Sequence, residues 1–156
     1  MYKILFVCLG NICRSAAAEA IMKAKVEKAG LSDKIYIDSA GILDYHEGEP
    51  ADRRMRTQCQ AHGYNVTSIS RPVTINDFDK FDLIIGMDNS NIDALKDGAM
   101  TDKEVEKIHA MKEYFRNSSE DYVPDPYLGG LAGFELVIAL LEDGCEGLLE
   151  EVRREL

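Results

Sequence analysis

The sequence predicts an α/β fold with three layers, in which helices cover both faces of a four-stranded parallel sheet. Short apolar runs alternate along the chain with longer segments of helical periodicity. The runs are continuously apolar, which is typical of parallel strands buried on both faces. The first run ends at a glycine-containing loop that leads directly into a helix. We therefore expect a ligand-binding loop after the first strand, beyond the C-terminal ends of the parallel strands.

The first strand and the first helix are the most clearly marked elements. Tyr2 to Cys8 is an apolar run rich in strand-forming residues, and it stops at Gly10. From Ser15 to Lys28 the composition changes to Ala, Glu, Lys and Met, and Gly30 is placed to end the helix. The chain is therefore predicted to open with a strand, a tight loop and a helix.

The remaining elements follow from similar signals. We expect strands at Ile35–Ile37, Phe81–Met87 and, weakly marked, Ile108–Met111, with helices over residues 50–62, over residues 90–97 and from Gly133 to the C-terminus. Pro50 suits the first turn of a helix, and Asp88 to Asn91 are rich in helix-capping residues. Because no linker, repeat or low-complexity segment interrupts these elements, residues 1–156 are predicted to form a single domain.

Composition and charge exclude several classes of function. The chain carries 18 basic and 28 acidic side chains, a net charge of −10. This balance argues against a nucleic-acid partner and against binding to anionic lipid, because both depend on a basic surface. No apolar run approaches the roughly 18 residues that a membrane span needs, so no membrane partner is expected. The four cysteines are too few and too unevenly spaced for a disulfide framework, which predicts a reducing, cytoplasmic location.

The loop after the first strand carries the predicted chemistry. Cys8 stands at the strand end and Arg14 follows six residues later, at the start of the helix. This C-x5-R spacing is weak evidence alone, but its position is informative. A helix N-terminus offers unpaired N–H groups, Gly10 lets the backbone approach an anion, and Asn11 tolerates a left-handed conformation. The loop is therefore expected to bind inorganic phosphate or a similar oxyanion, with Arg14 as a bidentate partner.

The same environment makes Cys8 a candidate nucleophile. Helix N-termini and nearby cations favour the thiolate form of cysteine, and Ser15 is placed to donate a hydrogen bond to the sulfur. We therefore predict that Cys8 attacks an electrophile directly. The alternative is a buried strand cysteine beside a surface arginine. It is disfavoured because an arginine in the first helical turn opposes the helix dipole unless an anion lies beside it.

The segment VCLGNICRS resembles the signature of the low-molecular-weight protein tyrosine phosphatases, and the resemblance covers nearly the whole chain. Further segments at similar spacing are Asp38-Ser39-Ala40-Gly41, residues 45–52, His62-Gly63, residues 81–88 and Pro124-Asp125-Pro126-Tyr127. The resemblance implies hydrolysis of phosphotyrosine through a cysteinyl-phosphate intermediate, with Cys8 as nucleophile, Arg14 binding the phosphate and Asp125 as general acid and then base. It implies no metal and no other cofactor.

Cleavage of phosphotyrosine also needs a general acid for a chemical reason that does not depend on the resemblance. A phenolate leaves faster when an acid protonates it, and Asp125 lies between two prolines that stiffen the loop and prevent a helix. Pro-Asp-Pro alone is more often a turn signal, so the assignment of Asp125 depends on the resemblance. An ionised Cys8 and a protonated Asp125 would give kcat/KM a bell-shaped pH profile with its optimum on the acid side of neutral.

The resemblance also assigns supporting positions. Loop residues expected to bind the substrate phosphate are Leu9, Gly10, Asn11, Ile12, Cys13 and Ser15; Tyr45 and Tyr127 wall the cleft; and Ser39 braces the loop together with Asn11. Three departures leave parts of this pattern open. Ser68 stands where the family has a bracing histidine, Leu128 stands where a second tyrosine is frequent, and Ile42-Leu43-Asp44 replaces a commoner Thr-Ser-Gly. Ile12 resembles the tyrosine-directed members, whereas relatives that act on phosphoarginine carry threonine there.

The other cysteines and histidines give weaker signals. Cys13 is close enough to Cys8 to form a reversible disulfide under oxidation, with simple packing as the alternative. Cys59 and His62 have the spacing of half a metal site, but no second pair accompanies them. Cys59 and Cys145 are therefore expected to be core residues.

Several functions compete with the phosphatase. An arsenate reductase of the same fold needs further cysteines to relay a disulfide, and a phosphoarginine phosphatase uses the same loop on another substrate. A phosphotransfer carrier or a phosphoprotein-binding module would need no acid at Asp125. The expected partner is a tyrosine-phosphorylated protein, for which a bacterial tyrosine kinase is one candidate.

Overall fold

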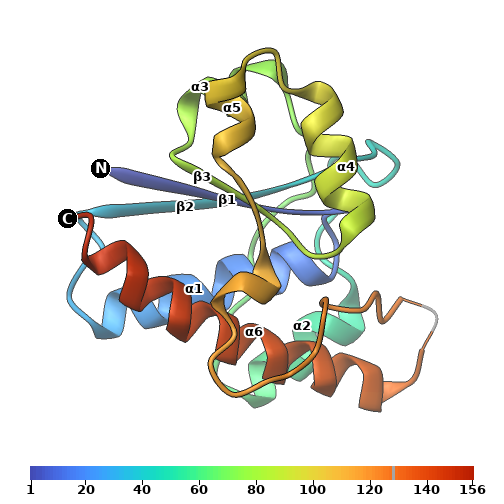
Figure 1. The fold of residues 1–156 in the computed structure, drawn as a ribbon. Coiled ribbons are helices and arrows are strands. Elements are labelled where there is room, and N and C mark those ends of the chain that lie inside the picture. Colours follow the sequence, from blue (N-terminus) through green and yellow to red (C-terminus); the bar gives the residue numbers. More distant parts are fainter. Residues whose placement is uncertain (128) are drawn as a thin grey trace.

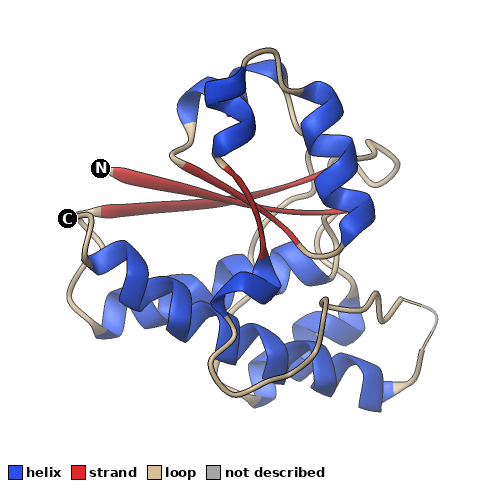
Figure 2. Ribbon diagram, in the orientation of Figure 1, coloured by secondary structure: helices blue, strands red, loops and turns tan. Residues whose placement is uncertain are grey.

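The computed structural model describes residues 1–127 and 129–156. Within them, four strands form one parallel sheet in the order β2-β1-β3-β4. The strands are β1 (Tyr2–Cys8), β2 (Ile35–Gly41), β3 (Leu83–Gly86) and β4 (Ile108–Ala110). Helices lie on both sides of the sheet (Figure 2). The predicted three-layer α/β fold with a four-stranded parallel sheet is therefore confirmed.

Two separate cores lie against the two faces of the sheet. One face is covered by α1 (Arg14–Lys28), α2 (Arg53–Ala61) and α6 (Leu131–Arg153), and the other by α3 (Ile75–Lys80), α4 (Asn89–Gly98) and α5 (Asp102–Glu106) (Figure 1). Successive residues of β1 alternate between them: Ile4 and Phe6 belong to one core, Leu5 and Val7 to the other. Because both faces are buried, β1 is apolar at each of these positions.

The structure corrects the predicted second strand and second helix. β2 continues to Gly41 instead of ending at Ile37, because its polar residues find partners: the Asp38 carboxylate accepts hydrogen bonds from Arg71. The helix predicted over residues 50–62 does not begin at Pro50, which instead forms an isolated antiparallel bridge with Ile69. α2 begins at Arg53 and is capped by the preceding Asp52. The prediction that Pro50 starts this helix was wrong.

Three short helical elements were not predicted: α3, α5 and the 3-10 helix η1 (Met111–Tyr114). They are too short to establish an apolar periodicity over two turns. Polar side chains hold their ends instead. Asp77 accepts a hydrogen bond from the backbone N–H of Thr74 in α3, and Thr101 accepts one from Glu104 in α5. The departure at Leu128 lies outside the described residues.

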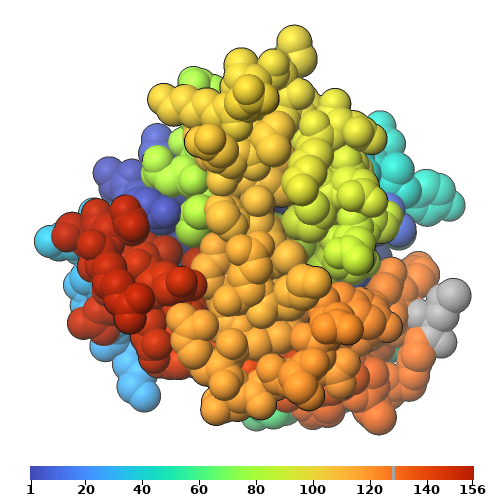
Figure 3. Space-filling view, viewed as in Figure 1, coloured from blue at the N-terminus to red at the C-terminus, as the bar shows by residue number. Residues whose placement is uncertain are grey.

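The chain after β4 crosses the surface between α4 and the C-terminal helix, as the space-filling view shows (Figure 3). It is fixed to α6 by Asp143, whose carboxylate accepts hydrogen bonds from the backbone N–H groups of Arg116, Asn117 and Ser118. Farther along, the Val123 N–H donates to the carbonyl of Met87, just after β3. These contacts bring the following residues to the C-terminal end of the sheet.

Over the described ranges, 1–127 and 129–156, we find no helix that is both long and apolar enough to cross a membrane.

Candidate active site

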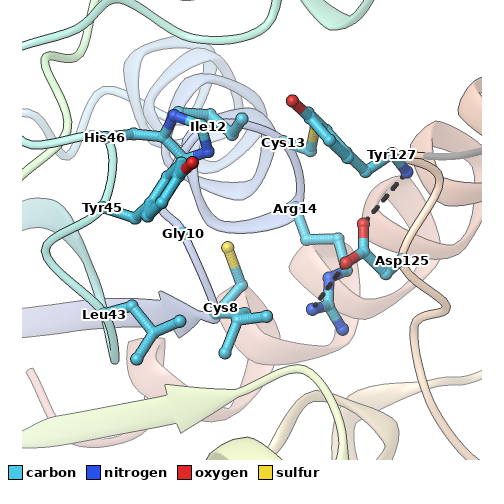
Figure 4. A pocket seen from close by; sticks show the side chains of 11 residues that line it. Cys8, Gly10, Ile12, Cys13, Arg14, Leu43, Tyr45, His46, Asp125 and Tyr127 are labelled. Carbon is cyan, nitrogen blue, oxygen red and sulfur yellow. Dashed lines mark hydrogen bonds and ion pairs between the residues drawn. The ribbon is translucent and has the colours of Figure 1, made fainter.

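A cavity of about 220 Å³ opens at the C-terminal end of β1 (Figure 4). Its lining residues are Cys8, Leu9, Gly10, Ile12, Cys13, Arg14, Leu43, Tyr45, His46, Asp125 and Tyr127. β1 is central, and its neighbours β2 and β3 lie on opposite sides of it. This reversal of strand order is the place where open parallel sheets bind ligands. The predicted nucleophile, arginine and acid therefore lie around one cavity, although Asp125 is far from the others in sequence.

The loop between β1 and α1 has the backbone expected of an anion-binding loop. Asn11 has a φ of +57°, the left-handed conformation that the sequence predicted it would tolerate. Cys13 is the N-cap of α1 and makes no side-chain capping hydrogen bond, while the Ser15 N–H in the first turn donates to Cys8 Sγ at 3.4 Å. The start of α1 therefore directs N–H groups and the positive end of its dipole toward Cys8 and toward an anion bound beside it.

The side chain of Asn11 holds the loop from inside. Its Nδ2 donates to Ser15 Oγ at 2.8 Å and to Ser39 Oγ at 3.0 Å, and its Oδ1 accepts from the Arg71 N–H at 3.1 Å. The predicted bracing pair, Asn11 and Ser39, is thus in contact. All three bonds agree with a single orientation of the amide.

The donor and acceptor roles in these hydrogen bonds determine which atom receives the hydroxyl proton of Ser15. Ser39 must donate its hydroxyl proton to the buried Glu19 carboxylate, 2.6 Å away, because a carboxylate can only accept. Ser39 and Ser15 then both accept from Asn11, which leaves the Ser15 proton for another acceptor. Cys8 Sγ lies 3.1 Å from Ser15 Oγ, nearer than the Ala40 carbonyl oxygen at 3.5 Å. The Ser15 hydroxyl is therefore set to donate to the sulfur and to stabilise a thiolate.

Glu19 was missed by the sequence analysis. It lies one turn beyond Ser15 on α1, and its second oxygen pairs with Lys23 at 2.6 Å. The available signal was a single acid within the otherwise apolar stretch from Ala16 to Met22.

Arg14 is buried rather than a surface charge. Its Nη1 donates to Asp88 Oδ2 at 2.7 Å and to the Val123 carbonyl at 3.1 Å. Burial lowers the pKa of Arg14, but the negative charges of Cys8 and Asp88 outweigh it and the net shift is upward. The guanidinium therefore stays charged beside the cavity. Asp88, which also caps α4 through Asn91, was predicted only as a cap.

Asp125 lies beside Arg14, on the side of the cavity away from Leu43, Tyr45 and His46 (Figure 4). Its Oδ1 accepts a hydrogen bond from the Tyr127 N–H at 3.0 Å, and its Oδ2 lies 3.8 Å from Arg14 Nη2. The side chain is 46% exposed, so the carboxyl group can exchange protons with water and still reach a bound molecule.

Aromatic rings surround the mouth of the cavity. His46 packs edge-on against Tyr45, with centroids 5.0 Å apart, and lies 6.2 Å from the ring of Tyr127. We call these three side chains the aromatic collar. His46 was not among the predicted site residues, although it stands beside Tyr45 in a segment that carries the resemblance. It also packs on the loop, since a Cβ at Gly10 would lie 3.2 Å from its ring.

Ser68 stands where the family has a bracing histidine, and other residues brace the loop in this protein. Ser68 Oγ is buried and has no hydrogen-bond partner among the described residues, so it does not brace the loop. Ser70 does so instead, donating from its hydroxyl to the Gly10 carbonyl at 2.9 Å. Ser70 and the backbone of Arg71 are thus the braces that sequence spacing did not find.

The other cysteines lie apart from this chemistry. Cys59 and Cys145 are fully buried and do not line the cavity, and burial raises the pKa of each to about 12. Burial, and then the charge of Asp52, raises the pKa of Cys13, which stays a neutral thiol. Among the described residues, no group of three or more His, Cys, Asp or Glu is arranged to hold a metal ion.

Comparisons with known proteins agree with this geometry. Residues 3–156 match the family described as low molecular weight phosphotyrosine protein phosphatase. A solved structure of a protein tyrosine phosphatase from Entamoeba histolytica, with Hepes in its active site, is 47% identical, covers 99% of both chains and has a TM-score of 0.97. The low molecular weight protein-tyrosine-phosphatase YfkJ of Bacillus subtilis is 41% identical over 99% of this chain and 98% of its own. A solved Drosophila arginine phosphatase is 34% identical, covers 96% of this chain and 97% of its own, and has a TM-score of 0.89.

Proposed function

Because this chain belongs to the low molecular weight phosphotyrosine protein phosphatases, we propose that Cys8, Arg14 and Asp125 hydrolyse phosphotyrosine in a protein substrate. The observation that carries the assignment of roles is the single cavity that all three residues line. A nucleophile at its base, a cation beside it and an acid at its rim are the three groups that cleavage of an aryl phosphate requires.

In the first step, the Cys8 thiolate attacks phosphorus in line with the tyrosine oxygen. A P–S bond forms and the P–O bond breaks, while Asp125 gives its proton to the departing oxygen. Arg14 and the N–H groups of the loop hold the non-bridging phosphate oxygens. Tyrosine leaves and Cys8 carries the phosphoryl group.

In the second step, water attacks the cysteinyl phosphate. Asp125, now a carboxylate, takes a proton from that water, and the P–S bond breaks. The Ser15 hydroxyl, 3.1 Å from the sulfur, stabilises the thiolate as it leaves. Inorganic phosphate is released and Asp125 is protonated again, so the cycle closes with no cofactor.

The aromatic collar supports an aryl phosphate as the substrate class. Tyr45, His46 and Tyr127 offer ring faces and edges at the mouth of the cavity, where the ring of a phosphotyrosine held by the loop would lie. Phosphoarginine is the competing substrate class, because an arginine phosphatase is among the similar structures. Comparing kcat/KM for one peptide carrying either phosphotyrosine or phosphoarginine decides between them, and we expect phosphotyrosine to be preferred.

Hydrolysis of p-nitrophenyl phosphate by the wild type, Cys8→Ser and Asp125→Asn tests the assigned roles. We expect no turnover from Cys8→Ser and a loss on the order of a hundredfold from Asp125→Asn. A Cys8→Ser variant that still turns over excludes the covalent mechanism, and an unchanged kcat of Asp125→Asn excludes Asp125 as the base that hydrolyses the cysteinyl phosphate. An arsenate reductase would need Cys59 or Cys145 as a relay, so reduction of arsenate that is lost in their serine variants would favour that function.

The partner is proposed to be a tyrosine-phosphorylated protein, and a bacterial tyrosine kinase is one candidate. Cys8→Ser retains Arg14 and the loop N–H groups but lacks the nucleophile, so it should hold such a substrate without cleaving it. Capture of phosphotyrosine proteins by this variant, and their release by free phosphate, would identify the partner.

A further inference from the structure

Arg54 connects the phosphate-binding loop to the segment that carries the general acid. It lies in the first turn of α2 and does not line the cavity. Its Nη2 donates to the Tyr127 carbonyl at 2.7 Å, while Nη2 and Nε donate to the two carboxylate oxygens of Asp52 at 3.0 and 3.2 Å. The Asp52 N–H in turn donates to the carbonyl of Ile12 at 2.8 Å. One guanidinium therefore joins two parts of the site that are distant in sequence.

The guanidinium also lies near two aromatic rings. Its central carbon lies 4.8 Å from the ring centroid of Phe134, a buried residue of α6, and 5.6 Å from that of Tyr127. A planar fork can stack on rings and donate in its own plane at the same time. Arg54 thus has a defined position although its side chain is 42% exposed.

The contact reaches Asp125 through the backbone of Tyr127. The Tyr127 carbonyl accepts from Arg54, and the Tyr127 N–H donates to Asp125 Oδ1. The prolines on either side of Asp125 restrict the backbone between these anchors. With Oδ1 engaged, Oδ2 is the oxygen directed toward Arg14 and the cavity. Fixing Tyr127 therefore fixes which carboxyl oxygen faces the leaving group.

We propose that Arg54 is a positioning residue for the general acid: by holding the Tyr127 carbonyl against α2 and α6, it keeps Asp125 over the cavity. The inference rests on the proposed role of Asp125. It assigns Arg54 no contact with substrate, because Arg54 does not line the cavity and its Nε and Nη2 are engaged by Asp52 and Tyr127. Replacing Arg54 should therefore lower kcat/KM most for substrates whose leaving group needs a proton.

Arg54→Met tests this, with Arg53→Met as the matched control on the neighbouring exposed residue. Methionine keeps length and apolar packing against the rings but removes the hydrogen bonds. Phenyl phosphate needs protonation of its leaving group, whereas 2,4-dinitrophenyl phosphate does not. We expect Arg54→Met to lower kcat/KM about tenfold for phenyl phosphate, within the range that general acid catalysis supplies, and to leave the dinitrophenyl ester near the wild-type value. Arg53→Met should change neither.

A double-mutant cycle with Asp125→Asn completes the test. If Arg54 acts through Asp125, adding Arg54→Met to Asp125→Asn causes no further loss with phenyl phosphate. An equal loss for both esters, or a fully additive loss on the Asp125→Asn background, would overturn the inference. If Asp125→Asn itself shows no dependence on the leaving group, the proposed role of Asp125 fails. Arg54→Lys, which keeps the charge without the planar fork, should fall between Arg54→Met and the wild type.

Discussion

At the scale of single residues, Asn11 shapes the loop in two separate ways. Its backbone adopts a left-handed conformation, and its side chain makes three hydrogen bonds. A residue with a Cβ is strained at a φ of +57°, by about 1–2 kcal/mol, and asparagine tolerates this better than most. Its amide meanwhile holds Ser15, Ser39 and the backbone of Arg71. Substitutions at this position can separate the two effects.

Asn11→Gly and Asn11→Ala should both lower kcat/KM, because both lose the amide that orients Ser15 toward Cys8. Their stabilities should differ. Glycine adopts the positive φ freely, whereas alanine does not, so Asn11→Ala should be less stable than Asn11→Gly by about 1 kcal/mol. Urea denaturation of the two variants measures this difference. Equal stabilities would contradict the left-handed conformation.

The residues themselves predicted the loop from Cys8 to Ser15, whose members stand close together in the chain, whereas Ser39, Tyr45, Asp125 and Tyr127 were predicted from the family resemblance. The pattern from Cys8 to Ser15 is contiguous, and its position between an apolar run and a helical segment makes the C-x5-R spacing informative. Glu19, Ser70 and Arg54 act through contacts with other elements, which depend on helix rotation and loop path. Neither is encoded in a local pattern, so these three roles could not be predicted from the sequence.

At the scale of elements, buried strands and long helices were predictable because their apolar patterns extend over many residues. The residue at which α2 begins was not predictable in this way. Proline at a first helical turn and proline at an edge bridge share the same fixed φ and the same missing N–H, so Pro50 alone does not distinguish them. The structure adopts the bridge with Ile69.

The glycines of α6 differ in how closely other parts of the protein pack against them. A Cβ at Gly147 would collide with the Tyr114 carbonyl oxygen at the end of η1, whereas one at Gly133 would lie 3.8 Å from the nearest side-chain atom. Gly133→Ala should stabilise the protein by up to about 1 kcal/mol through helix propensity. Gly147→Ala should instead destabilise it by about 1–3 kcal/mol. Thermal unfolding of the two variants compares them, and a stabilising Gly147→Ala would contradict the close packing of η1 on α6.

At the scale of the whole molecule, the charge is divided unevenly along the chain. Residues 1–78 carry 10 basic and 9 acidic side chains, whereas residues 79–156 carry 8 and 19. The phosphate-binding loop belongs to the nearly neutral half. A single phosphate can therefore be held by local N–H groups and Arg14 despite a net charge of −10, which still opposes a polyanion such as nucleic acid.

Acid should destabilise the fold partly through Asp143, which joins α6 to the chain after β4. Burial raises the pKa of Asp143, but hydrogen bonds from the N–H groups of residues 116–118 outweigh it, and the net pKa lies below the ordinary 3.8. The folded state therefore binds this proton less readily than the unfolded state. The resulting stability is fully present above the unfolded pKa and is lost as the pH falls through the folded pKa.

Asp143→Asn should accordingly be less stable than the wild type at neutral pH, and the difference should shrink as the pH falls below about 3.8. Chemical denaturation at several pH values follows this gap. A gap that stays constant across the acid range would show that the charge of Asp143 contributes nothing.

Detection of phosphate on Cys8 during turnover tests the central claim most directly. Asp125→Asn is the suitable variant: p-nitrophenyl phosphate needs little help from an acid to phosphorylate Cys8, whereas hydrolysis of the intermediate lacks its base. Rapid denaturation followed by peptide mass spectrometry should find one phosphoryl group on the peptide that contains Cys8, and none in the same variant with Cys8→Ser. An unmodified Cys8 in a variant that is still turning over, or a phosphoryl group on another residue, would contradict the mechanism.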